Sequence, residues 1–370
     1  MSEARSRFVR PARSPTFADR GERVDSRAVV CTLEGSPIGL QARNVYRDHL
    51  PYLSCPECRS LLLLDDTAEI VEEGMLACSG CPATYPIVRG VPRFVPAEDY
   101  TASFGLQWLR HSRTQYDSEN VRELSEDRFF RETGWPRNLR GELVIEVGSG
   151  SGRFTDVAAR TGAMILSVDR SLAVDANYAS NGASPRVLIV QADLLRMPFP
   201  DRSADRLYCF GVLQHTPDPR ASFFALLRYV KPRGAVVADV YAKTVSRYLL
   251  GTKYWVRPVT RHLPPALLYR MITVYVTIMW TVAKLLSRLP KIGWALSWRL
   301  LVPNYGALLP NASGSTLREW ARLEAFDMLA ARYDKPQTLA AVRRWAEEAG
   351  LLDAEVAYAG NGVEVRGLVP

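Results

Sequence analysis

The stretch at residues 143–152, Leu-Val-Ile-Glu-Val-Gly-Ser-Gly-Ser-Gly, decides how this chain folds. A short run of aliphatic and β-branched residues is typical of a buried parallel strand. The glycines that follow allow positive φ values and let the backbone approach a ligand closely. A helix after such a loop directs its N-terminal N–H groups toward anionic or polar ligand groups. Residues 143–152 therefore predict a strand, a ligand-binding loop and the start of a helix.

The spacing of the glycines indicates which ligand the loop would bind. A dinucleotide fingerprint is G-x-G-x-x-G, whereas here Arg153 occupies the position of the third glycine. Glu146 precedes the loop, where a carboxylate would repel a pyrophosphate and attract the ammonium of a methionine moiety. Asp169, twenty-one residues after the first glycine, suits a ribose with two free hydroxyl groups. The pattern favours S-adenosylmethionine over NAD, with an ordinary strand-to-helix turn as the alternative for the loop alone.

Four further strands are expected after the loop, with helical stretches between them: 164–169, 187–192, 204–210 and 235–241. Strands that alternate with helices predict an α/β fold, with a doubly wound and mostly parallel sheet. Ligands of such sheets bind at the carboxyl ends of the strands. Four predicted site residues lie at or just after the carboxyl ends of the first four strands: Glu146, Asp169, Asp193 and Phe210. One crevice is expected to collect them.

The ordered motifs resemble the class I S-adenosylmethionine-dependent methyltransferases, which have a Rossmann-like fold. The resemblance rests on Glu146-Val-Gly-Ser-Gly-Ser-Gly, Val168-Asp169, Gln191-Ala-Asp193 and Gly211-Val-Leu-Gln-His-Thr-Pro-Asp-Pro. The run Leu227-Arg-Tyr-Val-Lys-Pro-Arg-Gly fits the same family. The resemblance covers residues 141–243 and 336–370, which we expect to form the catalytic core.

The resemblance also implies roles for individual residues. Glu146 would lie near the methionine amino group, and Asp169 would bind the ribose hydroxyls. Asp193 would bind the adenine amine, with Leu194 against the ring and Phe210 on the floor of the crevice. The remaining residues expected at the cofactor are those of the loop and the neighbour of Asp169: Gly148, Ser149, Gly150, Gly152 and Arg170.

Length and charge leave several kinds of partner open. The chain has 370 residues, 47% of them hydrophobic, and a formal net charge of +8. Such a charge suits nucleic acid, acidic lipid or a phosphorylated substrate, or reflects a basic arm and scattered surface arginines. Residues 1–28 are rich in Arg, Ser and Pro, so residues 1–45 are expected to be disordered or irregular. Without the apolar core of a secretory signal there, we expect a cytoplasmic protein.

Four of the six cysteines have the spacing of a zinc site. Cys55 and Cys58 form one C-x-x-C pair, and Cys78 and Cys81 form a second pair nineteen residues later. This spacing is typical of four thiolates around one tetrahedral ion, with a disulfide or redox pair as the alternative. Cys31 and Cys209 lie outside the pattern. Residues 46–97 resemble the zinc ribbon of methyltransferase-activator proteins, which implies a structural zinc and a docking role.

A helical connector is expected over residues 98–140. Phe104 and Trp108 are four residues apart, so one helical face would carry both aromatic rings. This face would cap the cofactor crevice or simply pack between domains.

An insertion of about ninety residues, 244–335, separates the fifth strand from the last helix at 337–350 and a hairpin at 355–358 and 363–366. We expect it to be the substrate cap, because the resemblance implies that an insertion at this place lies over the substrate side of the sheet. Its residues 271–283 are uncharged but too few to span a bilayer. A narrow polar stripe marks that helix: Arg270, Thr273, Thr277, Thr281, Lys284 and Arg288.

Additional residues of the insertion suit an interface with lipid: Trp280, Trp294, Trp298, Lys291 and Arg299. The segment 264–302 is therefore expected either to lie on the inner face of a membrane or to be buried within the insertion or a dimer interface. The sequence does not indicate an oligomeric state.

His215 follows the fourth strand and is the candidate catalytic base or orienting group, unless it only bonds to backbone. The Asn/Asp-Pro-Pro-Tyr/Phe motif of many N-methyltransferases is absent after that strand, which favours O- or C-methylation. The expected acceptor is a small or lipid-linked molecule. An RNA base methyltransferase with a zinc domain is the second hypothesis, less favoured because the insertion lacks a basic and aromatic groove. A non-catalytic docking scaffold is the third.

Overall fold

The computed structural model describes residues 45–64, 70–96, 100–120, 122–245, 251–290 and 292–370. Every element below belongs to one compact unit, residues 42–370. The expected irregular arm lies outside the described residues, apart from residue 45. Cys31 and Lys291 also lie outside them.

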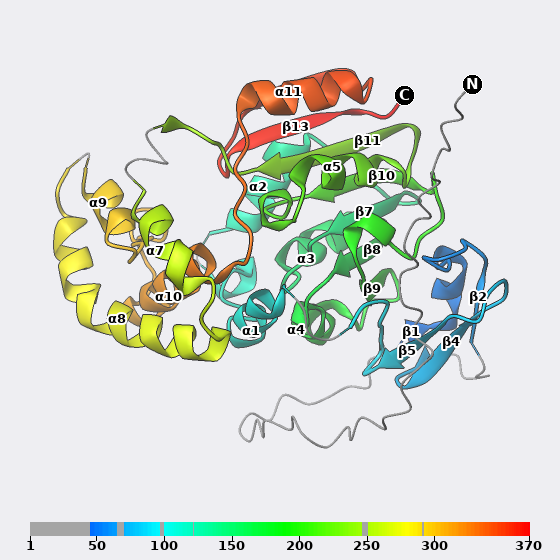
Figure 1. The fold of residues 1–370 in the computed structure, drawn as a ribbon, viewed down its shortest axis with the longest axis horizontal. Coiled ribbons are helices and arrows are strands. Elements are labelled where there is room, and N and C mark those ends of the chain that lie inside the picture. The colour runs from blue at the N-terminus through cyan, green and yellow to red at the C-terminus, as the bar shows by residue number, and fades with distance from the viewer. Residues whose placement is uncertain (1–44, 65–69, 97–99, 121, 246–250, 291) are drawn as a thin grey trace, which may run out of the picture. The chain divides into compact units, whose positions relative to one another are not determined.

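A seven-stranded sheet forms the centre of this unit, in the order β12-β13-β11-β10-β7-β8-β9. Five of its strands run parallel: β7 (Leu143–Val147), β8 (Met164–Asp169), β9 (Val187–Gln191), β10 (Ala204–Cys209) and β11 (Val230–Val240). The hairpin of β12 (Leu352–Tyr358) and β13 (Val363–Leu368) adds antiparallel pairs at one edge. Figure 1 shows this order from β13 to β9. The predicted Rossmann-like, mostly parallel sheet is confirmed.

Helices cover both faces of the sheet because side chains alternate along each strand. Ile145 of β7 joins a core that includes Phe223 of α5 (Pro219–Leu227) and Trp345 of α11 (Leu339–Glu348). Val144, the preceding residue, joins a second core formed with three other helices. These are α2 (Leu124–Thr133), α3 (Arg153–Arg160) and α4 (Ala173–Asn181). The glycine loop after β7 leads directly into α3, as the sequence predicted.

Strand β11 begins at Val230, five residues earlier than predicted. The expected turn 231–234 lies inside the strand, where the pairing with β10 shifts register between Ala204 and Arg206. Arg233 adopts a φ of 62°, and its N–H donates to the carbonyl of Val369 over 2.7 Å. Pairing with the C-terminal strand holds these residues in the sheet, so the Pro-Arg-Gly run forms a bulge.

Residues 45–64 and 70–96 contribute the strands of two small sheets. The first pairs β1 (Val45–Tyr46) with β3 (Ile70–Val71). The second has four antiparallel strands in the order β2 (Leu62–Leu64), β4 (Gly74–Cys78), β5 (Thr84–Val88) and β6 (Val91–Pro92). Leu53 and Ile87 are buried in the same core as the α5 face of the large sheet. Arg93 forms a parallel bridge with Gln191 at the end of β9, so this segment extends the edge of the large sheet.

The connector contains α1 (Ala102–Arg110), and short 3₁₀ turns lie at Arg47–Tyr52, Asp117–Glu119, Leu194–Arg196 and Leu213–His215. The insertion contains α7 (Thr252–Thr260), α8 (Pro265–Leu286), α9 (Gly293–Arg299) and α10 (Gly314–Ala330). A third core joins α8 to α10.

Helix α8 is longer than predicted from its uncharged segment. It spans 22 residues, because residues 265–270 and 284–286 continue the helix on either side. By length and composition alone it could cross a membrane, and 28% of its most apolar window is buried. One face is committed to the third core through residues at steps of three or four: Leu268, Ile272, Val276, Trp280 and Ala283. The rest of its apolar surface remains exposed.

Candidate cofactor and metal sites

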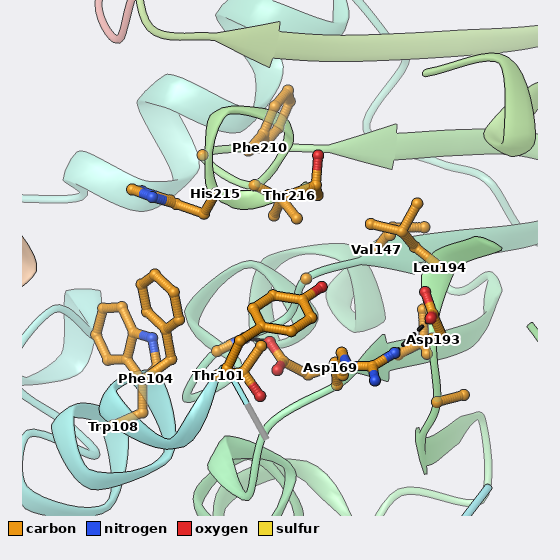
Figure 2. A pocket seen from close by; sticks show the side chains of 18 residues that line it. Thr101, Phe104, Trp108, Val147, Asp169, Asp193, Leu194, Phe210, His215 and Thr216 are labelled. Atoms are coloured by element: carbon orange, nitrogen blue, oxygen red, sulfur yellow. Dashed lines mark hydrogen bonds and ion pairs between the residues drawn. The ribbon is translucent and has the colours of Figure 1, made fainter. Parts of the chain in front are cut away.

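One pocket lies at the carboxyl ends of the parallel strands, where the sequence placed the crevice. Its wall includes eight of the predicted site residues: Gly148, Gly150, Asp169, Arg170, Asp193, Leu194, Phe210 and His215. Figure 2 shows Asp193 and Leu194 at one end, and His215 facing Phe104 and Trp108 at the other. Three predicted residues do not line the pocket: Glu146, Ser149 and Gly152. Helix α1 therefore contributes two aromatic side chains to the wall, as the capping alternative for the connector predicted.

The glycine loop adopts a conformation that other residues would strain. Gly148 has a φ of +77°, and a Cβ there would lie 2.0 Å from Cγ2 of Val212. Gly152 has a φ of +91°, and a Cβ there would lie 2.1 Å from Oδ1 of Asn177. Gly148 thus lets the loop pack closely against Val212 of the pocket wall, and Gly152 lets α3 pack against α4.

Asp169 joins the end of β8 to the glycine loop. Its Oδ2 accepts a hydrogen bond from the Gly150 N–H at 2.9 Å, and its Oδ1 accepts from Ser171 N–H and Oγ at 2.8 and 2.7 Å. Asp193 forms an ion pair with Arg170 and accepts from the Leu195 N–H at 3.0 Å. These contacts fix both carboxylates at the rim of the pocket, facing the same space (Figure 2).

Glu146 lies beneath the loop rather than in the pocket wall. It is buried, and its Oε2 accepts hydrogen bonds from Thr155 Oγ1 and Ser167 Oγ. Burial raises the pKa of this carboxyl to about 7, although the hydrogen bonds oppose the shift. Its charge is therefore sensitive to pH near neutrality.

His215 is held in one tautomer by backbone. Its Nδ1 lies 2.9 Å from the carbonyl oxygen of Tyr333, which can only accept, so Nδ1 carries the proton. The ring centroids of Phe104 and Tyr241 lie 5.0 and 5.4 Å from that of the imidazole. The other nitrogen, Nε2, is then an acceptor at the wall of the pocket. The histidine thus both bonds to backbone and presents a basic nitrogen.

Sequence reasoning missed several residues of this site. Tyr100 and Val212 line the pocket, and Tyr241 packs on the candidate base. The Arg170–Asp193 ion pair was also not expected. Tyr100 opens the aromatic connector, which was a local signal for it. The contact of Tyr333 with His215 joins residues 118 positions apart, and no local pattern could have indicated it.

The four cysteines with zinc spacing come together. All four Sγ atoms lie within 4.8 Å of one another, with 3.3 Å between Cys58 and Cys78 and 3.7 Å between Cys55 and Cys81. Four thiolates around tetrahedral zinc stand roughly 3.8 Å apart, given Zn–S bonds near 2.3 Å. The Gly80 N–H points at the Cys78 sulfur over 3.3 Å, as thiolates require. The four thiolates fit a structural zinc ion. They would fill all four coordination positions of the ion and leave none for substrate.

Comparison with known proteins agrees with this geometry. Residues 145–238 match a family model described as a methyltransferase domain. A ubiquinone biosynthesis O-methyltransferase of Pseudomonas fluorescens is 31% identical over 124 residues, 32% of this chain and 53% of that protein. The protein of the same name from Paracidovorax citrulli is 32% identical over 118 residues, 30% of this chain and 49% of that protein. The chain thus spans about half the length of the curated relatives it matches.

A solved S-adenosyl-L-methionine-dependent methyltransferase of Methanococcus maripaludis, named putative in its own description, aligns with 74% of this chain and 95% of its own. The sequence identity is 14% and the TM-score 0.40. The matched range runs from β7 to β11, so the similarity to a methyltransferase domain covers the five parallel strands of the large sheet. The matched relatives are O-methyltransferases by name.

Proposed function

We propose that this chain transfers the methyl group of S-adenosylmethionine to a hydroxyl group of a small apolar acceptor held at a membrane surface. The observation that carries the transfer is the pocket, in which Asp169, Asp193 and the glycine loop meet. The names of the curated relatives support oxygen as the methylated atom. The membrane location rests on the surface of α8.

Within this proposal the residues of the pocket mainly align the reactants. The bound cofactor would supply an activated methyl group on a positively charged sulfur. Asp169 would hold the ribose and Asp193 the adenine. Glu146, beneath the loop, would attract the methionine ammonium through water. A hydroxyl nucleophile must lose its proton, and Nε2 of His215 is the acceptor at the pocket wall. Phe104 and Trp108 would exclude water beside it.

The insertion carries an apolar surface that water does not favour. Many large apolar side chains between residues 255 and 292 are more than one-third exposed: Trp255, Val259, Leu267, Met271, Val274, Tyr275, Ile278, Val282, Leu285, Leu289 and Ile292. Those on α8 recur along the helix, which gives its exposed face a continuous apolar surface, and such a surface marks an interaction site. Because α8 buries its opposite face against α10, we infer that it lies along the surface of a membrane and does not span it.

The charge of the insertion suits anionic lipid. The insertion, residues 244–335, contains thirteen Lys or Arg residues and four Asp or Glu residues, all four of which lie at or after position 319. Basic residues beside exposed apolar ones are attracted to an acidic leaflet, where each contributes roughly 1 kcal/mol. RNA would attract the same charges but would leave Ile278 and its apolar neighbours in water. We therefore infer a lipid surface, on the cytoplasmic side, and an acceptor dissolved in or linked to lipid.

The zinc ribbon, expected to be a docking module, would dock against the methyltransferase domain of its own chain. Arg59 donates to the carbonyl of Met197 at 3.0 Å, and Ser54 N–H donates to that of Pro198 at 2.8 Å. These contacts support a ribbon that braces the methyltransferase domain rather than a free scaffold.

The test is transfer of labelled methyl groups by the purified chain. Labelled S-adenosylmethionine is incubated with a lipid extract, a water-soluble metabolite extract or total RNA. We expect label in the lipid extract, in a product one methyl group heavier by mass spectrometry. Label in RNA alone would overturn the acceptor class. Failure to bind the cofactor in calorimetry would overturn the methyltransferase activity itself.

A further inference from the structure

Arg153, the first residue of α3, has a guanidinium without a counter-ion. No ion pair or hydrogen bond of its side chain occurs among the residues that the structure describes. Its carbon Cζ lies 4.5 Å from the centroid of the Phe154 ring. That contact occupies the flat face of the group and leaves its N–H edges for a ligand. Arg128, close by, has two acidic partners instead, Glu132 and Asp239.

Arg153 is partly buried, and its electrostatic surroundings favour the binding of an anion. Burial and the neighbouring charge of Arg128 lower the pKa of Arg153 to about 10. Among the acidic groups, Glu324 has the largest electrostatic influence on Arg153, yet the two form no ion pair. Burial together with Asp327 raises the pKa of Glu324 to about 7, so this carboxyl is only partly ionised at neutral pH. An anionic ligand would supply the missing charge.

Other polar atoms close to Glu324 also lack partners. Gln115 donates its Nε2 to Glu324 at 3.3 Å, but its buried Oε1 has no hydrogen-bond partner in the described part of the chain. The same holds for the indole Nε1 of Trp320, whose ring is tilted against that of Tyr305 with centroids 4.8 Å apart. Buried polar groups are normally paired, so several unpaired ones together indicate a ligand. We call these five residues, Arg153, Gln115, Tyr305, Trp320 and Glu324, the Arg153 cluster.

The cluster lies next to the pocket and reaches into the insertion. Arg153 directly follows the glycine loop, and Phe154 packs edge-on against Phe210 of the pocket wall, with ring centroids 5.4 Å apart. Tyr305, Trp320 and Glu324 belong to the insertion, outside the matched domain 145–238. A ligand at the cluster would therefore contact both the domain that holds the cofactor and the segment proposed to choose the acceptor.

We propose that Arg153 binds an anionic group, a carboxylate or a phosphate, of the methyl acceptor, with the rest of the cluster completing the site. This inference rests on the proposed function and names the charge of its substrate. The acceptor is then amphiphilic: its acidic group pairs with Arg153, its apolar part lies toward the insertion, and its hydroxyl faces His215.

The test compares two anionic ligands with a neutral one that matches the first of them in shape. The chain, saturated with S-adenosylhomocysteine, is titrated with 4-hydroxybenzoate, phenyl phosphate and the neutral 4-hydroxybenzamide in a calorimeter. We expect at least one anion to bind about tenfold or more tightly than the amide, as a charge-assisted hydrogen bond predicts. Arg153→Met should abolish this preference, and Arg153→Lys should retain part of it. Arg160→Met, on the same helix and half exposed, is the matched control.

Three outcomes would overturn the proposal. Equal affinity for anions and amide, or no binding of either anion, would show that the site does not select charge. Retention of the preference in Arg153→Met would assign it to other residues. Loss of S-adenosylhomocysteine affinity in Arg153→Met would assign the arginine to the cofactor's own carboxylate. If the unaltered chain does not bind S-adenosylhomocysteine, the proposed function fails instead, so the two failures are distinguishable.

Discussion

The backbone N–H of Gly150 donates to Oδ2 of Asp169 over 2.9 Å. This bond ties the middle of the glycine loop to the end of the next strand, 19 residues later. Asp169 thus sets the position of the loop as well as facing the pocket. A ribose bound there would meet a carboxylate whose remaining bonds, from Ser171, already fix its orientation.

Asp169→Asn should weaken cofactor binding strongly. The amide lacks the charge that favours ribose hydroxyl donors, and its NH₂ group clashes with one of the N–H donors now bound to the carboxylate. Hydrogen bonds to charged groups contribute about 1.5–3 kcal/mol, so we expect a loss of about ten- to a hundredfold in affinity. Calorimetry with S-adenosylhomocysteine measures it. Asp201→Asn, an exposed site away from the pocket, should bind normally, and equal affinities in both variants would refute the role of Asp169.

Cofactor affinity should depend on pH through Glu146. Its pKa is raised by burial to about 7, above the ordinary 4.5, so the native state holds this proton where the unfolded chain has lost it. The stability contributed by the group is therefore greatest below pH 4.5 and falls as pH rises toward 7. Binding of a methionine ammonium requires the ionised form, so affinity should rise between pH 5.5 and 7.5.

Glu146→Gln provides the check on this titration. We expect weaker binding at pH 7.5 and a flatter pH dependence, because the amide cannot ionise. Taking the difference between variant and unaltered chain removes the contribution of Glu324 and Glu364, whose pKa values also lie near 7. An unchanged pH profile in the variant would exclude Glu146 as the titrating group.

The parts of the fold that sequence patterns predicted are those encoded locally. The strand β7 and the glycine loop follow from a β-branched run and three glycines within ten residues. The four zinc-type cysteines follow from spacing alone. Strand β11 was predicted to start late, because the Lys-Pro-Arg-Gly run has the composition of a turn. That run belongs to the strand because Arg233 pairs with Val369, which is distant in the sequence. No local pattern indicates this pairing.

The contacts of the site that the sequence did not predict join residues far apart in the chain. A Cβ added at Gly150 would lie only 3.0 Å from Nε1 of Trp108. This close packing joins two residues that are 42 positions apart in the chain. Arg93 donates to Oε1 of Gln191 at 3.2 Å, and Gln191 donates to the carbonyl of Arg170. The exposed surface of α8 could not be predicted either, because periodicity does not show which apolar face packs against another element. In the structure, α10 packs against one face of α8 and leaves the other exposed.

His215 should affect turnover but not cofactor binding. Its Nδ1–H is fixed by the Tyr333 carbonyl, so Nε2 is the nitrogen available as a base. General bases contribute about 10²–10⁴-fold to rate, and His215→Gln should lose methyl transfer to the lipid extract by that order. Calorimetric affinity for S-adenosylhomocysteine should stay within about twofold. If the variant turns over normally, the histidine only supports the loop.

Removal of zinc should loosen the cofactor site as well as the ribbon. The unaltered chain should contain one zinc per molecule by mass spectrometry, and Cys58→Ser should contain much less. The ribbon core, with Leu53 and Ile87, is continuous with that of the large sheet, so we expect a lower Tm. Affinity for S-adenosylhomocysteine should also fall, through the link from Arg93 to Gln191. Cys209→Ser, buried in β10, is the control, which should retain zinc; a zinc-free Cys58→Ser with unaltered Tm would contradict this account.

Charge and apolar surface on α8 should act together in membrane binding. The chain is expected to co-sediment with vesicles that contain phosphatidylglycerol and much less with vesicles of phosphatidylcholine alone. Val274→Glu with Ile278→Glu places two carboxylates on an exposed face, at 59% and 67% exposure, and should abolish co-sedimentation without lowering Tm. Leu63→Glu, an equally exposed apolar site on the ribbon, should leave it intact. If the double variant instead converts a dimer to a monomer in light scattering, while the unaltered chain ignores both kinds of vesicle, the apolar face of α8 is an interface between copies of the chain.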